Sequence, residues 1–194
     1  MRNFLIISVI GPDGSGKSLL IDYLVKQFKK KKINTIKIHL KPAIFKKKKH
    51  IVKNPHNQIP RSSIFSNFKL FYWLLIFWIY FLFNFKKKKK IFFFDRYPHD
   101  ILIDPLRYRI KSPNTFLQKI LDFFPKPNYW IFMTGEPKKV WLRKKEIEFK
   151  VLKKQIKQYA ELKKTFRNSI SISKKQEFYN IFQLILKKFN KIKI

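Results

Sequence analysis

The stretch that decides the fold is Phe4-Leu-Ile-Ile-Ser-Val-Ile10, followed at once by Gly11-Pro-Asp-Gly-Ser-Gly-Lys-Ser18. The first seven residues are a short, nearly continuous apolar run, as in a strand buried on both faces within a parallel sheet. From Ser18 to Phe28 the apolar residues recur at a helical spacing. The order strand, glycine-rich turn, helix is typical of the first unit of an α/β domain.

The turn matches the pattern G-x-x-x-x-G-K-[ST] in the strand-to-helix context that this pattern requires. Three of the four glycines in the chain fall within it, and glycine lets backbone N–H groups turn inward around phosphate oxygens. We expect Lys17 to reach the β- and γ-phosphates of ATP and the Ser18 hydroxyl to bind Mg²⁺. The predicted ATP-binding residues are Gly11, Pro12, Asp13, Gly14, Ser15, Gly16, Lys17 and Ser18.

Further apolar runs alternate with helical patterns along the rest of the chain. Strands are expected at 4–10, 35–40, 91–94, 129–133 and 169–172, and helices after Ser18 and at 70–83, 116–124, 140–166 and 178–189. Alternation of this kind predicts an α/β, three-layer P-loop NTPase fold with about five parallel strands and helices on both faces. Residues 43–62 contain a lysine run and two prolines and are expected to form a mobile loop. The absence of a repeat or a linker predicts one domain over residues 1–194.

A second cluster of polar residues, Asp95-Arg96-Tyr97, follows the expected strand 91–94. Ligands of a parallel sheet collect at the carboxyl ends of its strands. A carboxylate there can position Mg²⁺ or polarise the attacking oxygen, and the neighbouring arginine can neutralise charge on a phosphoryl group in transfer. The alternative is an Asp–Arg pair that only closes a turn.

The segment from Leu70 to Phe83 is fourteen consecutive apolar or aromatic residues between Lys69 and the run Lys86–Lys90. A membrane-spanning helix needs about 20 such residues. The length therefore favours a buried core helix, and contact with a membrane surface is the alternative. The apolar run at 4–10 is too short for a signal peptide and lacks a cleavage pattern, so we expect a cytoplasmic protein.

The composition is very basic, with 45 Lys and Arg against 11 Asp and Glu and a formal net charge of +34. Only seven of these cations are arginine, the residue on which nucleic-acid readers rely. Lys, Ile, Phe and Asn are inflated together, as A/T-only codons would cause, so specific nucleic-acid binding is not expected. The positive field would still attract nucleotides. With no cysteine in the chain, disulfides, Fe–S clusters and thiolate zinc sites are excluded.

These motifs together resemble the thymidylate kinase-like family of P-loop nucleoside monophosphate kinases, most closely a divergent bacterial branch. The landmarks are the loop with Asp13, then Asp95-Arg96-Tyr97, then Pro137 followed by Arg143-Lys-Lys-Glu146. The run Asp104-Pro-Leu-Arg-Tyr108 also matches the branch, and the resemblance covers residues 4–190.

The resemblance implies a role for each matching residue. Asp13 would contact a sugar hydroxyl of the acceptor, and Arg96 would bind the acceptor phosphate with Tyr97 packed nearby. Asp95 would serve the Mg²⁺ and phosphate centre, and Arg143 would begin a helical lid over ATP at 136–166. The implied sets are Lys17, Asp95, Arg96 and Arg143 for catalysis, Asp13, Arg96 and Tyr97 for the substrate, and Ser18 and Asp95 for the metal.

The implied reaction is ATP- and Mg²⁺-dependent phosphoryl transfer to a nucleoside monophosphate, thymidylate or a related acceptor. The alternative is a basic ATP-binding protein that acts on nucleic acid or at a membrane, and a homodimer is left open. Three positions depart from the family pattern: Lys69 replaces an arginine, Asp100 a serine and Lys138 a glutamate. Several other residues have two readings, as ligand contacts or as structural and solvated groups: His39, Asp104, Arg107, Arg109, Lys144, Lys145, Lys150, Lys153 and Lys154.

Overall fold

Five parallel strands form one sheet in the computed structural model, which describes residues 4–40, 59–85, 89–110, 115–145 and 147–192. The strands are β1 (Phe4–Ile10), β2 (Asn34–His39), β3 (Lys90–Asp95), β4 (Tyr129–Met133) and β5 (Ser169–Ile172). Their order across the sheet is β2-β3-β1-β4-β5, and every pair is parallel. The predicted fold class and all five predicted strands are confirmed.

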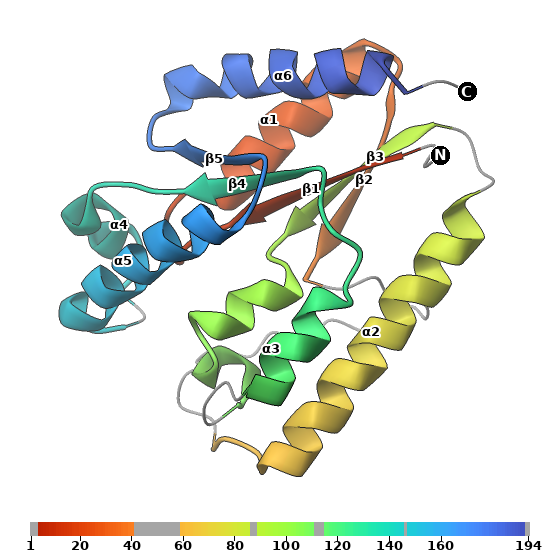
Figure 1. Cartoon of the computed structure of the whole chain (residues 1–194). Coiled ribbons are helices and arrows are strands. Elements are labelled where there is room, and N and C mark those ends of the chain that lie inside the picture. The colour runs from red at the N-terminus through yellow and green to blue at the C-terminus, as the bar shows by residue number, and fades with distance from the viewer. Residues whose placement is uncertain (1–3, 41–58, 86–88, 111–114, 146, 193–194) are drawn as a thin grey trace.

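Helices cover both faces of the sheet and make three layers (Figure 1). The helices α1 (Lys17–Lys30) and α6 (Phe178–Asn190) lie on one face. The helices α2 (Ser63–Phe85), α3 (Thr115–Asp122) and α5 (Phe149–Thr165) lie on the other, and the short α4 (Pro137–Arg143) follows β4. Within the described residues, three 3₁₀ turns lie at Pro98–Leu102, Leu106–Tyr108 and Lys175–Glu177.

The alternation of side chains along the buried strands creates two hydrophobic cores. In β1, Phe4, Ile6 and Ile10 face the α2 and α3 layer, whereas Leu5, Ile7 and Val9 face α1 and α6. In β3, Phe92 and Phe94 join the first core and Ile91 and Phe93 the second. Because strands covered on both faces carry apolar residues at every position, these runs are continuous in the sequence.

The expected helix over residues 140–166 is two helices, and this prediction is corrected. Helix α4 ends at Arg143, Lys144 has an extended backbone (φ −155°, ψ 93°), and α5 begins at Phe149. The indole Nε1 of Trp141 donates to the carbonyl of Ile147 at 2.9 Å and closes the link between the helices. A charged linker without Gly or Pro carries no local signal for such a break.

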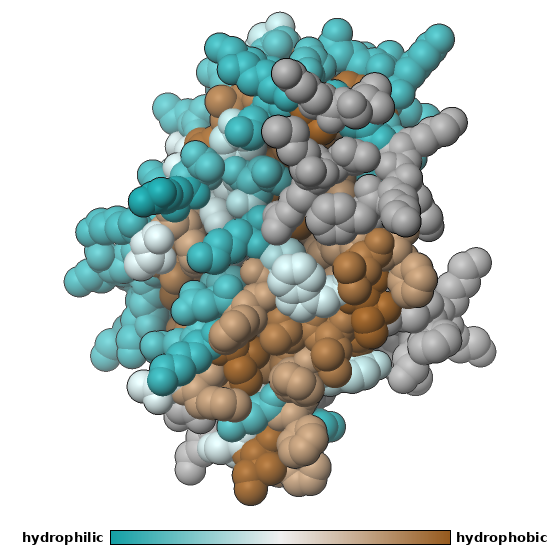
Figure 2. Space-filling view, turned by 45° about the vertical axis from the view of Figure 1, so that its right-hand side comes forward, coloured by the Kyte–Doolittle hydropathy of each residue, from teal (hydrophilic) through white to brown (hydrophobic). Residues whose placement is uncertain are grey.

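Helix α2 is longer than its apolar run and is buried on one side only. Leu70, Trp73, Phe77 and Phe81 pack into the core against β1 and β3. The opposite side is exposed and apolar, as the space-filling view shows (Figure 2). The outer face of α2, as we call it, comprises Ile64, Phe65, Phe68, Phe71, Tyr72, Leu75, Trp78, Ile79, Leu82 and Phe83.

The expectation of a buried core helix is therefore right for one side of α2 only. From Ser63 to Phe83 the helix is long and apolar enough to cross a membrane, yet 33% of that stretch is buried inside the molecule. Most of the predicted loop 43–62 lies outside the described residues, which resume at Ile59.

Candidate active site

The predicted phosphate-binding loop, residues 11–18, joins β1 to α1 and is held tightly against two other segments. Gly11, Gly14 and Gly16 all have positive φ, at 148°, 77° and 95°. A Cβ on Gly11 would lie 2.6 Å from the carbonyl oxygen of Met133, and one on Gly14 would lie 2.7 Å from that of Val140. Only glycine combines these angles with this close approach, so the loop requires the residues that the motif places there.

Lys17 is buried inside the loop that precedes it. Its Nζ donates to the carbonyl oxygens of Gly11 at 2.8 Å and Pro12 at 2.7 Å, and lies 3.8 Å from an Asp13 carboxylate oxygen. Burial, and next the charge of Arg96, lower the pKa of Lys17 to about 7, while Asp13 and the nearby acids oppose this shift. The ammonium group is thus poorly solvated and responds strongly to an added negative charge.

Ser18, in the first turn of α1, and Asp95, at the end of β3, are in contact. Because β1 and β3 are paired with Val9 beside Asp95, the start of α1 lies next to the end of β3. The Ser18 hydroxyl donates to Asp95 Oδ2 at 3.0 Å. Hydroxyl and carboxylate oxygens are suitable ligands for Mg²⁺, so this pair fits the metal-binding role predicted for it.

The pair would hold Mg²⁺ only together with other oxygens. In the described part of the chain no three His, Asp or Glu side chains gather into a metal site. Mg²⁺ is commonly bound by one or two protein oxygens together with substrate phosphates and water. His39 extends the polar edge of the site from the next strand, with Nδ1 4.0 Å from Asp95 Oδ2.

Arg96 holds the acidic side of the site in place. Its backbone is left-handed (φ 73°) and its N–H donates to the carbonyl of Val9 at 3.0 Å. The buried guanidinium donates to Asp13 through one nitrogen and to Asp100 through the other. Arg107 donates to the second oxygen of Asp13, so this carboxylate lies between two arginines.

Asp100 binds Arg96 and connects it to helix α5. This fully buried carboxylate accepts hydrogen bonds from Tyr108 at 2.7 Å and from Tyr159, on α5, at 2.5 Å. Burial alone would lower the pKa of Arg96, but Asp100 and the other partners hold it well above its usual value. Burial and the Asp100 carboxylate raise the pKa of both tyrosines, which therefore stay protonated as donors.

Tyr97 lies in the core and not in the site. Its ring packs against Phe94 and Trp130, and its hydroxyl donates to the carbonyl of Pro125. Tyr97 is fully buried and does not line the cavity that Arg96 lines, so the structure does not bring it to the substrate-binding position predicted for it. Tyr97 instead fixes the backbone from which Arg96 extends.

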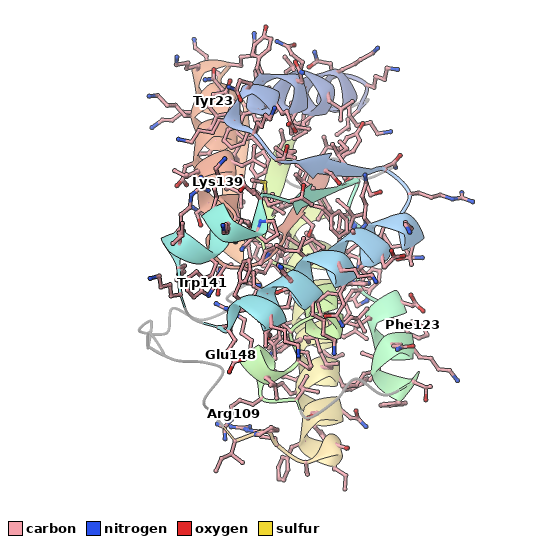
Figure 3. All side chains as sticks on the ribbon, turned by 90° about the vertical axis from the view of Figure 1, so that its left-hand side faces the viewer. Tyr23, Arg109, Phe123, Lys139, Trp141 and Glu148 are labelled. Carbon is pink, nitrogen blue, oxygen red and sulfur yellow. The ribbon has the colours of Figure 1, made fainter. Side chains whose placement is uncertain are left out.

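The end of helix α4, in the predicted lid, lies beside the same loop. Arg143 lies near the carbonyl of Gly14, with its Nη1 3.5 Å away, and Lys144 lines the same cavity. Figure 3 looks onto α4 and α5, with Trp141 and Glu148 labelled where the helices are joined. Lys145 and Lys153 lie over the rings of Trp141 and Phe149, and like Lys150 and Lys154 they are exposed.

One cavity of about 390 Å³ brings these groups together. Its charged lining consists of the cations Lys17, Arg96, Arg107, Arg143 and Lys144 and the acids Asp13 and Asp95. All four predicted catalytic residues are among them, in a volume suited to a small molecule.

Sequence reasoning left two parts of this arrangement undecided or undetected. Of the candidates Asp104, Arg107 and Arg109, only Arg107 lines the cavity, whereas Asp104 is buried and Arg109 donates to the carbonyl of Ile59. The supporting residues Asp100, Tyr108 and Tyr159 were not predicted. An acid four positions after Arg96 was the one available signal.

Comparisons with known proteins agree with this fold. No model of a known protein family matches the chain, and no curated protein is similar to it in sequence. Among solved structures, deoxyadenosine kinase from M. mycoides with bound dCMP and dCDP is similar, with TM-score 0.54 and 16% identity over 97% of this chain and all of that one. YorR from Bacillus subtilis, in complex with phosphorylated GDP, has TM-score 0.56 and 14% identity over 97% of this chain and 99% of that one. This chain therefore shares its overall fold with these two proteins.

Proposed function

We propose that this protein is an ATP- and Mg²⁺-dependent kinase that transfers a phosphoryl group to a nucleoside monophosphate. The observation that carries the proposal is the single cavity in which Lys17 of the phosphate-binding loop faces Asp95, Arg96 and Arg143. Phosphoryl transfer needs little beyond positioning and electrostatic stabilisation, and these residues supply both. Such a reaction draws on cytoplasmic ATP, in keeping with the location expected from the sequence.

Each group in the cavity has a place in the transfer. The loop amides and Lys17 bind the β- and γ-phosphates. Ser18 and Asp95 are the residues that would hold Mg²⁺. Mg²⁺, when bound, neutralises charge on the phosphate oxygens. An acceptor oxygen forms a bond to the γ-phosphorus while the bond to the bridging oxygen of ADP breaks. Arg96 and Arg143 stabilise the negative charge that spreads over the transferred group.

The charge balance of the cavity supports an acceptor that is itself a phosphate. Five cations against two acids exceed what one triphosphate with its metal would neutralise. Arg107 and Arg96 share Asp13 and form a second anion-binding position beyond Lys17. A phosphate oxygen at neutral pH can attack without a base to remove a proton. Thymidylate is the acceptor that the family resemblance implies, with a sugar hydroxyl against Asp13.

The test is release of ADP from ATP and Mg²⁺ with a panel of nucleoside monophosphates and the corresponding nucleosides. We expect turnover with at least one monophosphate, thymidine monophosphate among the first to be assayed. Turnover with nucleosides alone would keep the kinase and overturn the acceptor class. ADP release that needs DNA or RNA and no small acceptor would overturn the kinase and support the alternative of a nucleic-acid-stimulated ATPase.

The variant Arg107→Gln tests whether Arg107 binds the acceptor. It keeps the loop intact, and we expect it to raise the KM for the monophosphate about tenfold with little change in the KM for ATP, because one charged hydrogen-bond donor is lost. An equal rise in both KM values would assign Arg107 to ATP.

A further inference from the structure

The carboxylate of Asp13 is surrounded by cations in the cavity. Arg96 donates to its Oδ1 and Arg107 to its Oδ2, so each oxygen is bound by a guanidinium from a different segment of the chain. The ammonium group of Lys17 lies 3.8 Å from Oδ1. Because arginine binds carboxylates and phosphates through the same charged hydrogen bonds, Asp13 occupies a position that is equally suited to a phosphate group.

The arginine side of this position is held by contacts that do not involve Asp13. The side chain of Arg96 is 3% exposed, and its other terminal nitrogen donates to the buried carboxylate of Asp100. Arg107 belongs to a 3₁₀ turn that ends at Tyr108, whose hydroxyl donates to Asp100 at 2.7 Å. Asp100 thus holds Arg96 directly and holds the segment of Arg107 through Tyr108.

The side chain of Asp13 is the part of this position that can move. It is 19% exposed and lines the cavity of about 390 Å³. The neighbouring backbone is fixed, since the carbonyl of Pro12 accepts hydrogen bonds from the N–H of Ser15 at 3.3 Å and from Lys17 at 2.7 Å. Rotation about the side-chain torsions of Asp13 is therefore enough to withdraw its carboxylate from the arginines.

We propose that Asp13 occupies the place of the acceptor phosphate until the acceptor binds and displaces it. This inference rests on the proposed function and adds to it a competitor that belongs to the chain itself. In the empty protein the carboxylate is bound to Arg96 and Arg107, and in the occupied protein phosphate oxygens take its two positions. The displaced carboxylate stays on the cavity wall, where it can accept a hydrogen bond from the sugar hydroxyl of the acceptor.

A competitor of this kind sets a threshold for the anions that bind. Every anion that displaces Asp13 loses the same free energy, because its apparent affinity is reduced by the fraction of molecules in which the arginines are available. A phosphate monoester carries a charge of about −1.5 to −2 at pH 7 and has three terminal oxygens. It therefore exceeds the single charge of the carboxylate, whereas a phosphodiester does not. The site thus favours acceptors that end in a phosphate monoester.

The first experiment measures the binding of inorganic phosphate by calorimetry, because this probe has no sugar hydroxyl to contact Asp13. Asp13→Asn keeps the size of the side chain and removes its charge. We expect the dissociation constant for phosphate to fall about tenfold, the order of effect for one charged hydrogen-bonding partner. A dissociation constant that is unchanged or higher in folded Asp13→Asn overturns the proposal.

The matched control is Asp95→Asn, which removes the other acid that lines the cavity. Asp95 is bonded to Ser18 and not to the arginine pair in the described structure, so its replacement should change phosphate binding several-fold less than Asp13→Asn does. An equal fall in the dissociation constant for both variants would indicate a general effect of charge in the cavity and would overturn the proposal.

A double variant separates the arginine pair from the phosphate-binding loop, which can also bind inorganic phosphate. In the Arg107→Gln background the gain from Asp13→Asn should fall to about threefold or less, because one of the contested guanidiniums is gone. The same tenfold gain in both backgrounds would assign the phosphate to Lys17 and its loop and would overturn the proposal. Circular dichroism checks the folding of each variant.

The displacement can also be followed in the unchanged chain. It contains six aspartates, so ¹³C labels on their carboxyl carbons give few resonances. Inorganic phosphate should shift the Asp13 resonance and leave that of Asp22, which pairs with Lys37 on the surface, in place. An Asp13 resonance that stays constant at saturating phosphate overturns the proposal.

These measurements do not depend on phosphoryl transfer. Phosphate binding as described, in a protein that releases no ADP with any monophosphate, would refute the proposed function and leave the displacement of Asp13 supported. Turnover of a monophosphate, together with unchanged phosphate binding in Asp13→Asn, would keep the kinase and refute the displacement.

Discussion

The cavity at the carboxyl edge of the sheet and the outer face of α2 are built in opposite ways. In the cavity, Asp13, Arg96 and Asp100 are bound to one another, and Lys17 is bound to the loop. On the outer face, ten large apolar side chains are exposed by between 40% and 73%. The polar groups of the cavity are thus held by partners inside the molecule, whereas the apolar side chains of the outer face remain exposed to solvent. Most of the net charge of +34 lies outside both regions.

The largest effect is expected in the cavity, on the rate of phosphoryl transfer when Lys17 is replaced. In Lys17→Ala the γ-phosphate loses its buried cation, and the rate of phosphoryl transfer should fall about 10³-fold, the order found for the loss of one preorganised donor. Lys26→Ala, on the exposed side of the same helix, is the control and should be unaffected. The measurement is ADP release together with circular dichroism. Near-normal transfer in folded Lys17→Ala would refute the assignment of the loop.

The two sides of α2 give the next effect, this time on stability. Phe77 is fully buried, and Phe77→Ala should lower the free energy of unfolding by about 3–5 kcal/mol, as for other buried aromatic residues. Phe71 is half-exposed, and Phe71→Ala should cost less than about 1 kcal/mol.

Both of these substitutions are made in the otherwise unchanged chain, and unfolding is followed in urea. An equal loss in the free energy of unfolding for both variants would mean that both sides of α2 are packed against the rest of the chain. The outer face would then not differ from the core in packing.

The depressed pKa of Lys17 predicts how nucleotide binding depends on pH. Above about pH 7 the free protein holds this side chain neutral, whereas a bound triphosphate favours the charged form. Binding at pH 8 should therefore take up nearly one proton and at pH 6 almost none, with the affinity about tenfold lower at pH 8 than at pH 6. Calorimetry in two buffers of different ionisation enthalpy measures the uptake. Lys17→Arg, which stays charged, should show none from this position, and equal uptake in both proteins would place the proton elsewhere.

The smallest effect, on kcat, is expected at Tyr159, which binds the Asp100 carboxylate that holds Arg96. Tyr159→Phe removes one hydrogen bond to Asp100 and loosens the link between α5 and the site, so kcat should fall about fivefold. Because Tyr159 touches no ligand, the KM values for ATP and the acceptor should change little. Tyr179→Phe on α6 is the control. A rise in KM with unchanged kcat would show that Tyr159 acts through the binding of substrate and not through Arg96.

The sequence predicted the sheet and the loop because their signals are local. A continuous apolar run marks each central strand, and the glycines at 11, 14 and 16 mark positions where the backbone must take positive φ. Asp95 and Arg96 were placed because Asp95 ends β3 and Arg96 directly follows it. In all these cases the residues that decide the structure lie within a few positions of one another.

What the sequence could not predict depends on contacts between distant segments. Arg107 and Asp13 are 94 positions apart, and Tyr159 and Asp100 are 59 apart, so no local pattern brings either pair together. Helix α2 is apolar on all sides, and its periodicity therefore could not distinguish the buried side from the exposed one. The break after Arg143 results from the hydrogen bond of Trp141 to Ile147, which a charged linker does not reveal.

Because Gly14 lies close to the carbonyl of Val140, we expect the fluorescence of Trp141 on α4 to report on the nucleotide site. With no free space between them, a small shift of the loop backbone around a phosphate must displace α4, which carries Trp141 one residue further along. Trp73 and Trp130 are buried in the core and Trp78 lies on the outer face of α2, so their surroundings should stay constant. The intrinsic fluorescence of this chain should therefore report ATP occupancy through Trp141 without any added label.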